Sequence, residues 1–191
     1  MLKTKKTIAY AIACALIASG ACALAPCIGA VQPQQAQAKS AMKVASAGIK
    51  SGRIAKKYGY KHGNTSLPLN VTKIPKNAKY LAIYMRDLNV SWDHWLATDL
   101  SKGAASATSK KIIAGASRKW SKKMVQGTTG YGLTSYEGPW PPQTHTYAIT
   151  VYALKSKTGL SSGYSYSQFK KAIKGKVVKQ CTIKGKYTYT N

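Results

Sequence analysis

Four segments rich in apolar, aromatic and β-branched residues limit the fold of this chain more than any other feature of its sequence. Residues 78–85 (AKYLAIYM) are almost continuously apolar, which is typical of a strand buried on both faces. Residues 92–100 and 146–154 share this character, while residues 177–189 mix β-branched and aromatic residues with lysine in loose alternation. Clusters of Gly, Ser, Thr, Asn and Pro separate the segments, as expected for turns. We therefore predict a mainly β domain in which these segments form antiparallel strands.

One short helix is predicted near the C-terminal end of the chain. Phe169, Ala172 and Ile173 fall on one face of this helix, and lysines occupy the opposite face. Ser167 is the predicted N-cap of the helix, and Gly175 is the predicted stop.

The charge balance of the chain limits its chemistry and its partners. The 191 residues include 30 Lys and Arg but only 4 Asp and Glu, so the formal net charge is +26. Four acids are too few for a multi-carboxylate metal site and leave little for a glycosidase carboxylate pair. With 45% hydrophobic residues the chain can build one packed core, which excludes a disordered chain. The charge favours anionic partners, but the lysines occur in short groups, so no specific nucleic-acid partner is expected.

Residues 1–38 have the layout of a secretory signal peptide. Three lysines among the first six residues precede an apolar run over residues 8–31, and an Ala-Gln-Ala cleavage site ends at Ala38. Because the apolar run is longer than the usual ~7–15 residues, an uncleaved N-terminal membrane anchor is the alternative. We expect a secreted or cell-surface domain of residues 39–191. Its single cysteine, Cys181, allows no internal disulfide and is expected to be a small hydrophobe within a strand.

The few acidic residues lie close in sequence to two of the three histidines. His94 lies within a segment of thirteen residues that contains three aspartates, and the glutamate lies eight residues before His145. On a surface nearly free of carboxylates, each acid is expected to have a bonding partner. Three of these positions can converge on one cleft: an Asp that ends one strand, a His that opens the next, and a second His after a Gly-Pro turn. The alternative is that His94, which lies between two tryptophans, is a hydrogen-bonded core residue. The four acids are Asp87, Asp93, Asp99 and Glu137.

Several of these segments resemble the phosphatidylethanolamine-binding protein family, including its bacterial Raf kinase inhibitor-like members. Residues 136–142 (YEGPWPP) and the following His-Thr-Tyr of residues 145–147 are similar to the family's Tyr-x-Gly-Pro-x-Pro-Pro and His-x-Tyr motifs. Residues 93–95 (Asp-His-Trp) resemble the family's His-Trp strand start, and residues 54–69 resemble its early segment. The closing Gly-x-Tyr is matched by residues 185–187. The matches occur in family order over nearly the whole of the expected domain.

The resemblance implies an antiparallel β-sandwich-like domain with one small anion pocket that accepts phosphate or phosphorylethanolamine. No metal or cofactor is expected, because the two histidines and one aspartate lack metal-ligand spacing. One family motif, Asp-Pro-Asp-x-x-Pro, is replaced by residues 87–91 (DLNVS), so Asn89 stands where the second acid is expected. This replacement predicts a looser loop and a preference for a purely anionic ligand over a zwitterion. Carried over by position, the ligand-binding residues are Asp87, His94, Gly138, Trp140, Pro141, His145 and Tyr147.

Three classes of function remain open at this point. The first is an exported, non-catalytic binding protein for a phosphate-like anion or a phosphorylated headgroup, with peripheral attachment to an anionic membrane or cell-wall surface. The second is an extracellular protein-interaction module, such as an inhibitor of a hydrolase or protease. The third is a hydrolase, which is least favoured because no activated Ser or Cys nucleophile accompanies the Asp and His residues.

Overall fold

The computed structural model describes residues 41–190. The contacts separate Lys39–Asn191 as one compact unit of the chain. Within residues 41–190 the chain buries two hydrophobic clusters, which are the kind of core that a single domain requires. The predicted signal peptide lies outside the described residues, and no helix within residues 41–190 is long and apolar enough to cross a membrane.

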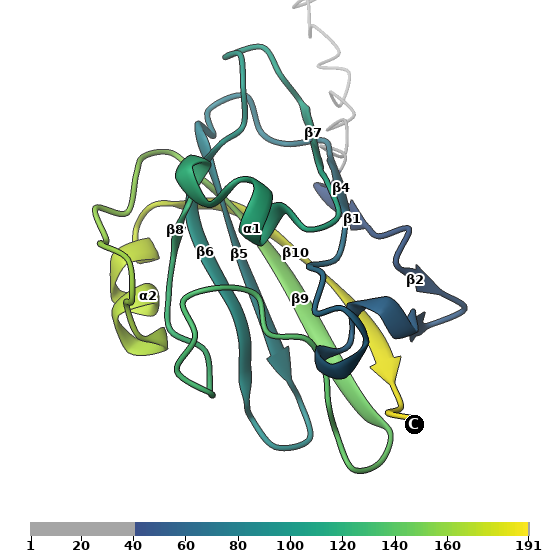
Figure 1. Cartoon of the computed structure of the whole chain (residues 1–191). Helices are drawn as coiled ribbons and strands as arrows, with labels where there is room; N and C mark the ends of the chain where they lie inside the picture. The colour runs from purple at the N-terminus through teal and green to yellow at the C-terminus, as the bar shows by residue number, and fades with distance from the viewer. Residues whose placement is uncertain (1–40, 191) are drawn as a thin grey trace, which may run out of the picture. The chain divides into compact units, whose positions relative to one another are not determined.

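The domain is mainly β, as predicted, and short helices flank its sheets (Figure 1). There are two α-helices in the described residues, α1 (Ala116–Lys119) and α2 (Tyr166–Ile173), and three 3-10 helices, η1 (Lys56–Tyr58), η2 (Tyr60–His62) and η3 (Ser121–Lys123). The strands are β1 (Lys43–Ala45), β2 (Ile49–Lys50), β3 (Arg53–Ile54), β4 (Leu69–Thr72), β5 (Tyr80–Asp87), β6 (Asp93–Ser101), β7 (Ser109–Ile112), β8 (Val125–Gln126), β9 (His145–Leu154) and β10 (Val177–Tyr187).

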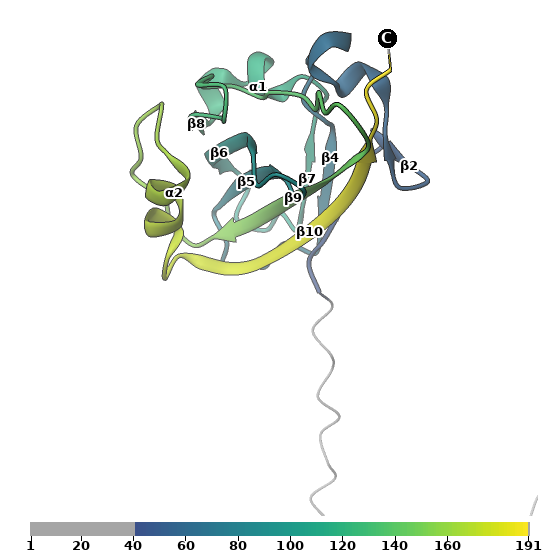
Figure 2. The same ribbon diagram turned by 90° about the horizontal axis from the view of Figure 1, so that it is seen from below.

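The strands form two sheets, one of three strands in the order β1-β4-β7 and one of seven in the order β2-β3-β10-β9-β5-β6-β8. The large sheet is curved, as the path of β9 and β10 in Figure 2 shows. The four long strands expected from the sequence are β5, β6, β9 and β10, which pair with one another in antiparallel fashion. The predicted antiparallel β fold is confirmed, and one pairing departs from it, because β3 pairs with β10 in parallel through Arg53 and Lys186.

The main hydrophobic core lies between the two sheets. Val71 from β4, Ile83 from β5 and Val151 from β9 belong to one buried cluster. Buried and half-buried residues alternate along β9, because successive side chains of a strand point to opposite faces. This alternation puts both His145 and Ile149 on the face that meets the core, and the pocket described below forms where that face reaches the end of the strand.

Helix α2 covers the other face of the large sheet, where Phe169 and Ile173 pack against residues of β5 and β6. Its N-cap is Ser165, whose hydroxyl accepts a hydrogen bond from the Gln168 N–H, while the Gln168 side chain accepts one from the Ser165 N–H. The prediction of Ser167 as the cap is therefore wrong, because the capping box places the glutamine three residues after the cap. Gly175 follows the helix with a φ of +73°, as expected of a helix stop.

The free cysteine Cys181 lies in β10, half-buried against the main core. Burial raises the pKa of its thiol to about 11, so the sulfur remains a neutral thiol at physiological pH. This agrees with the expectation of a small hydrophobe in a strand.

Candidate functional site

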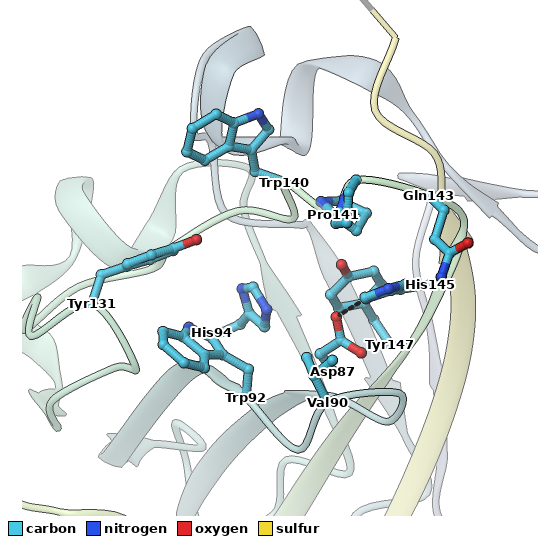
Figure 3. A pocket seen from close by; sticks show the side chains of 11 residues that line it. Asp87, Val90, Trp92, His94, Tyr131, Trp140, Pro141, Gln143, His145 and Tyr147 are labelled. Carbon is cyan, nitrogen blue, oxygen red and sulfur yellow. Dashed lines mark hydrogen bonds and ion pairs between the residues drawn. The ribbon is translucent and has the colours of Figure 1, made fainter.

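A pocket of about 410 Å³ opens at the end of the sandwich where β5 ends and β9 begins. Figure 3 shows Trp140 and Pro141 on one side of this pocket and Val90 and Trp92 on the other, with His94 between them. The residues that line the pocket are Asp87, Val90, Trp92, His94, Tyr131, Trp140, Pro141, Pro142, Gln143, His145 and Tyr147.

The pairing of β5 with β9 brings three of these residues together. Asp87, the last residue of β5, lies opposite Tyr147 of β9. His145 precedes Tyr147 by two residues, so the two side chains point to the same face of the sheet. All three side chains are buried. The register of two long strands thus fixes one carboxylate, one imidazole and one phenol in a single wall.

An irregularity in β6 aims the second histidine at the pocket. Met85 pairs with Trp95 and the next residue, Arg86, pairs with Asp93, so His94 is the extra residue of a β-bulge. A bulge of this kind re-aims side chains beside functional sites. Asp93 turns toward the α2 side, where its Oδ1 atom accepts a hydrogen bond of 2.6 Å from the Tyr84 hydroxyl. Although they are neighbours in the chain, Asp93 therefore does not line the pocket and His94 does.

His145 and Asp87 form a buried ion-pairing contact. The Nδ1 atom of His145 donates to Oδ2 of Asp87 over 2.7 Å, and Asp87 Oδ1 accepts from the Asn89 N–H over 2.8 Å. Burial by itself would raise the pKa of Asp87. The hydrogen bonds from His145, the Asn89 N–H and the Tyr147 hydroxyl outweigh that effect and hold the pKa below its ordinary value. Asp87 is therefore an anion at neutral pH and accepts the hydrogen bond from His145 as a carboxylate.

His94 is held by a backbone carbonyl instead of a carboxylate. Its Nδ1 atom lies 2.8 Å from the Glu137 carbonyl oxygen, which can only accept, so Nδ1 carries a proton. Burial lowers the pKa of His94 despite this hydrogen bond and the nearby Asp87 and Asp93 carboxylates. The ring meets Tyr147 edge to face, with 5.1 Å between the ring centroids. The site therefore holds two differently supported imidazoles, of which His94 favours the neutral form.

The phenol of Tyr147 remains protonated throughout the physiological pH range. Burial and the neighbouring Asp87 carboxylate raise its pKa well above the ordinary value. Its single hydroxyl proton is donated to the Asp87 carboxylate, so the phenol steadies that carboxylate and leaves only its oxygen as an acceptor in the wall of the pocket.

Six of the seven residues predicted to bind ligand line the pocket, and Gly138 does not. Its N–H donates to Asn64 Oδ1 over 2.7 Å, so this group is already bonded within the protein. A Cβ atom at Gly138 would lie 2.3 Å from the Tyr58 carbonyl oxygen. Glycine is needed here because two backbones approach closely, and its role is to place the turn that carries Trp140 and Pro141.

The loop that contains Asn89 is fastened to β9, contrary to the expectation of a looser loop. The Asn89 Oδ1 atom accepts from the Thr146 N–H over 2.9 Å, and the Leu88 N–H donates to the Thr146 carbonyl over 2.9 Å. Asn89 therefore uses its side chain to secure the loop and does not line the pocket. The amide can make this bond without the charge of the acid that the family motif carries.

Each of the four acids has a partner, as expected. Besides Asp87 and Asp93, Asp99 accepts from the Thr158 N–H and hydroxyl over 2.7 and 3.0 Å. The fully buried Glu137 accepts through Oε2 from the Thr129 hydroxyl and from the Tyr131 N–H. Burial raises the pKa of Glu137 despite these hydrogen bonds. Within the described residues, no acid forms an ion pair with lysine or arginine.

Sequence reasoning missed the aromatic walls formed by Trp92 and Tyr131. The Trp92 indole packs over Gly130, where a Cβ atom would lie 2.1 Å from the ring. Trp92 and Tyr131 meet with 5.1 Å between ring centroids. One sequence signal was available. Tyr131 directly follows a glycine in a Gly- and Thr-rich segment that is not predicted to form a strand, so its aromatic side chain has no expected place in a sheet.

The donor set of the pocket is not that of a metal centre. Among residues 41–190, no group of three or more His, Cys, Asp and Glu side chains is arranged to hold a metal ion. The pocket instead combines N–H and O–H donors with aromatic walls, which suits a small anion with oxygen acceptors.

Comparison with known proteins agrees with this fold. The chain is 30% identical to a UPF0098 protein of Archaeoglobus fulgidus over 173 residues, which cover 87% of this chain and 57% of that relative. It is 30% identical to a UPF0098 protein of Methanothermobacter thermautotrophicus over 140 residues, which cover 71% of this chain and 91% of that protein. The chain thus spans little more than half the length of the Archaeoglobus relative but nearly all of the second.

Two solved structures share the fold. The structure of a phosphatidylethanolamine-binding protein homologue from Chlamydia trachomatis gives a TM-score of 0.68 at 28% identity, over 78% of this chain and 99% of that one. YbcL of E. coli, a member of the mammalian PEBP family, gives a TM-score of 0.67 at 23% identity over the same shares of the two chains. The family model described as phosphatidylethanolamine-binding protein matches residues 45–188. This chain belongs to the phosphatidylethanolamine-binding protein family.

Proposed function

We propose that this chain is an exported, non-catalytic binding protein whose pocket holds a small phosphate-like anion, free or as the phosphorylated headgroup of a larger molecule. One observation carries the proposal. His94 and His145 are each bonded at Nδ1 to an acceptor of the protein, which leaves the Nε2 atom of each ring for the pocket, beside the Tyr147 hydroxyl. Export rests on the predicted signal peptide of residues 1–38.

The two histidines have complementary roles toward such an anion. An imidazolium at His145 would donate through Nε2–H to a phosphate oxygen in a charge-assisted hydrogen bond while Nδ1–H stays bonded to Asp87. The Tyr147 hydroxyl donates to Asp87, so toward a ligand its oxygen can only accept, from a protonated phosphate oxygen. His94 favours the neutral form, so its Nε2 atom can accept a hydrogen bond from a protonated phosphate oxygen. The pocket therefore fits a partly protonated phosphate group better than a fully ionised one.

The chemistry of the lining supports binding over catalysis and a pure anion over a zwitterion. The lining contains no Ser, Thr, Cys or Lys that could serve as an activated nucleophile. Its one carboxylate, Asp87, is already bonded to His145, so an ammonium group would find no free carboxylate there. The aromatic walls provide apolar contact for whatever group the phosphate carries.

Isothermal titration calorimetry of residues 39–191 with inorganic phosphate and with phosphorylethanolamine tests the proposal. We expect saturable binding of one phosphate per chain, tighter than that of phosphorylethanolamine. His145→Ala and Tyr147→Phe should each weaken binding by at least about tenfold, the loss expected for one charge-assisted or one ordinary hydrogen bond in a buried site. His62→Asn, which changes a histidine outside the pocket, should bind as the unmodified domain does. Equal binding by all four proteins would overturn the proposal.

A further inference from the structure

Two lysines of β10 lie on the outer face of the large sheet, which is the face turned away from the main core. Gly185 and Tyr187 of this strand are buried on the core side. Because successive side chains of a strand point to opposite faces, Lys184 and Lys186 point outward, and both are exposed.

The hairpin of β2 and β3 adds two further cations to this outer face. A Cβ atom at Gly185 would meet the Ile49 and Ile54 side chains, so these two isoleucines lie on the core side of the hairpin. Each isoleucine has a cation as its neighbour within the strand, Lys50 in β2 and Arg53 in β3. These two side chains therefore point outward, and both are exposed.

Strand pairing brings three of these cations into one row. Lys50 lies opposite Arg53, and Arg53 lies opposite Lys186. A two-residue turn fixes the first pairing, since both residues of the turn, 51 and 52, have the positive φ that a type I′ hairpin requires. Neighbouring strands lie about 4.8 Å apart, so three positively charged side chains start side by side at this spacing. We call the four residues Lys50, Arg53, Lys184 and Lys186 the basic face.

No carboxylate of residues 41–190 balances the basic face. The one ion-pairing contact of an acid in this part of the chain is that of Asp87 with His145, on the core side of the sheet. Asp93, Asp99 and Glu137 bond instead to hydroxyl and N–H groups of the protein. Like charges directly opposite each other on neighbouring strands destabilise a sheet. An anion that lies on the basic face therefore relieves a repulsion that the protein itself leaves uncompensated.

The shape of this face favours an extended anion over a compact one. Helix α2 packs on the same face of the sheet over β5 and β6, and it lies on the opposite side of the domain from β2 in both views (Figures 1 and 2). The basic face is therefore left uncovered, and none of its residues lines the anion pocket. A compact anion finds no walls there. A chain of anions can lie across the strands and contact several cations, whose weak contacts then add up.

The side chains beside the cations disfavour nucleic acid as that chain. Single-stranded nucleic acids are held largely by aromatic side chains on which the bases stack. The outward positions of β9 and β10 next to the cations carry small side chains instead, and the hydroxyls of one pair, Thr150 and Thr182, lie 2.8 Å apart. A phosphate polymer without bases loses nothing on such a floor. These small residues are Thr146, Ala148, Thr150 and Thr182.

We propose that the basic face binds a linear phosphodiester polymer that carries no bases, of the chemical type of poly(glycerol phosphate). The inference goes beyond the proposed ligand of the pocket, because the basic face shares no residue with the pocket and lies on the other face of the sheet. Successive phosphates of the polymer would contact Lys50, Arg53 and Lys186 along the row, with Lys184 beside it.

Fluorescence anisotropy of end-labelled poly(glycerol phosphate), titrated with residues 39–191, tests the proposal. The face variant combines three substitutions at exposed positions, Arg53→Gln, Lys184→Gln and Lys186→Gln. The matched control removes the same charge from exposed lysines of α1 and η3, which lie far from β10 in Figure 2. Its substitutions are Lys119→Gln, Lys122→Gln and Lys123→Gln.

We expect saturable binding that is at least about tenfold weaker for the face variant and changed by less than about threefold for the control. The dependence of log affinity on log salt concentration should become shallower by about two for the face variant, because each lost phosphate contact removes about 0.7 from this slope. His145→Ala should bind the polymer as the unmodified domain does, so failure of the pocket proposal and failure of this one give different results.

Thermal unfolding checks the like-charge argument and the integrity of the fold. The face variant should unfold at a temperature no lower than that of the control, because its substitutions remove repulsion between neighbouring strands. Unfolding at a clearly lower temperature would contradict the repulsion on which the proposal rests.

Three binding results would also overturn the proposal. The first is no saturable binding of poly(glycerol phosphate). The second is an equal loss of affinity in the face variant and the control, which would mean attraction by net charge alone. The third is tighter, face-dependent binding of a deoxythymidine oligonucleotide with the same number of phosphates, which would assign the basic face to nucleic acid.

Discussion

The Nδ1 atom of His145 lies 2.7 Å from Oδ2 of Asp87, and both side chains are buried at the end of the sandwich. Strand pairing fixes the contact, because Asp87 ends β5 directly opposite Tyr147, two residues after His145 on the same face of β9. The contact fixes the direction in which the His145 ring presents Nε2 to the pocket.

Replacing Asp87 by Asn should weaken phosphate binding by about tenfold. The amide keeps a hydrogen-bond acceptor for His145 but removes the charge that strengthens this hydrogen bond and holds the ring in place, and tenfold corresponds to about 1.4 kcal/mol. Calorimetry with inorganic phosphate measures the loss. Asp99→Asn is the matched control, since it makes the same change of net charge at a carboxylate that bonds Thr158 outside the pocket. Equal affinities for the two variants would refute the role given to Asp87.

The Asp87 pair should also appear in the pH dependence of stability. Because the folded pKa of Asp87 lies below its unfolded value of about 3.9, its contribution to the free energy of unfolding is complete above pH 4 and is lost as the pH falls through the folded pKa. Asp87→Asn should therefore be destabilised relative to the unmodified domain at pH 7, with the difference shrinking below pH 4. Urea unfolding at several pH values measures this, and a difference that stays constant down to pH 2 would contradict it.

His94 should give a pH dependence in a different window. Its folded pKa is lowered by burial, so the unfolded chain takes up the proton first and stability falls as the pH drops from 7 through the unfolded value of about 6.5. His94→Asn keeps a donor for the Glu137 carbonyl and removes the titration. The free energy of unfolding of this variant should vary less between pH 7 and pH 5 than that of His62→Asn, the control. Parallel curves for the two variants would show that His94 does not titrate as described.

We expect Glu137 to stabilise the segment that carries Tyr131 and to make no contact with the bound anion. Glu137→Ala leaves the buried Thr129 hydroxyl and the Tyr131 N–H without their acceptor, which costs about 1–3 kcal/mol. Glu137→Gln keeps an oxygen acceptor and should cost less. Chemical denaturation ranks the two variants, and a larger loss for Gln than for Ala would mean that the charge of Glu137 matters more than its hydrogen bonds.

A methyl group at Gly138 should be costly although this residue does not line the pocket. The Cβ atom would meet backbone atoms of Tyr58, Gly59 and Tyr60, so Gly138→Ala should lose about 3 kcal/mol of stability. Gly159 is the control, because a Cβ atom there meets no other atom and only the positive φ of +78° is unfavourable for alanine. Gly159→Ala should therefore lose about 1 kcal/mol of stability. Thermal unfolding compares them, and equal losses would argue against the close packing of Gly138.

The elements that follow from local pattern could be predicted from the sequence, and those that depend on distant contacts could not. The long strands β5 and β9 could be predicted because each is a nearly continuous apolar run, a pattern typical of a buried strand. The two-residue strands β2, β3 and β8 carry no such pattern, since their partners lie far away in the chain. The parallel pairing of β3 with β10 is of the same kind, because a single pair of residues defines it.

The site shows the same division. Asp87, His145 and Tyr147 follow from family motifs that lie on strands with a regular register. The motif also indicated Gly138 as a contact, but its N–H bonds to Asn64, which is distant in sequence. The inward aim of His94 depends on a bulge in β6 whose position is set by the pairing with β5. Trp92 and Tyr131 form a wall only because Gly130 leaves room for an indole ring, and no local pattern encodes that contact.

Nitrogen NMR of the three histidine rings during a titration with inorganic phosphate tests the central claim most directly, because each ring reports on its own surroundings. His62 is an internal control, since it bonds to the Tyr187 hydroxyl outside the pocket. We expect a proton on Nδ1 in both His94 and His145, saturable changes at their Nε2 atoms with one common dissociation constant, and no saturable change at His62. Unchanged Nε2 signals from His94 and His145, or equal and unsaturated changes in all three rings, would contradict an anion site between these two histidines.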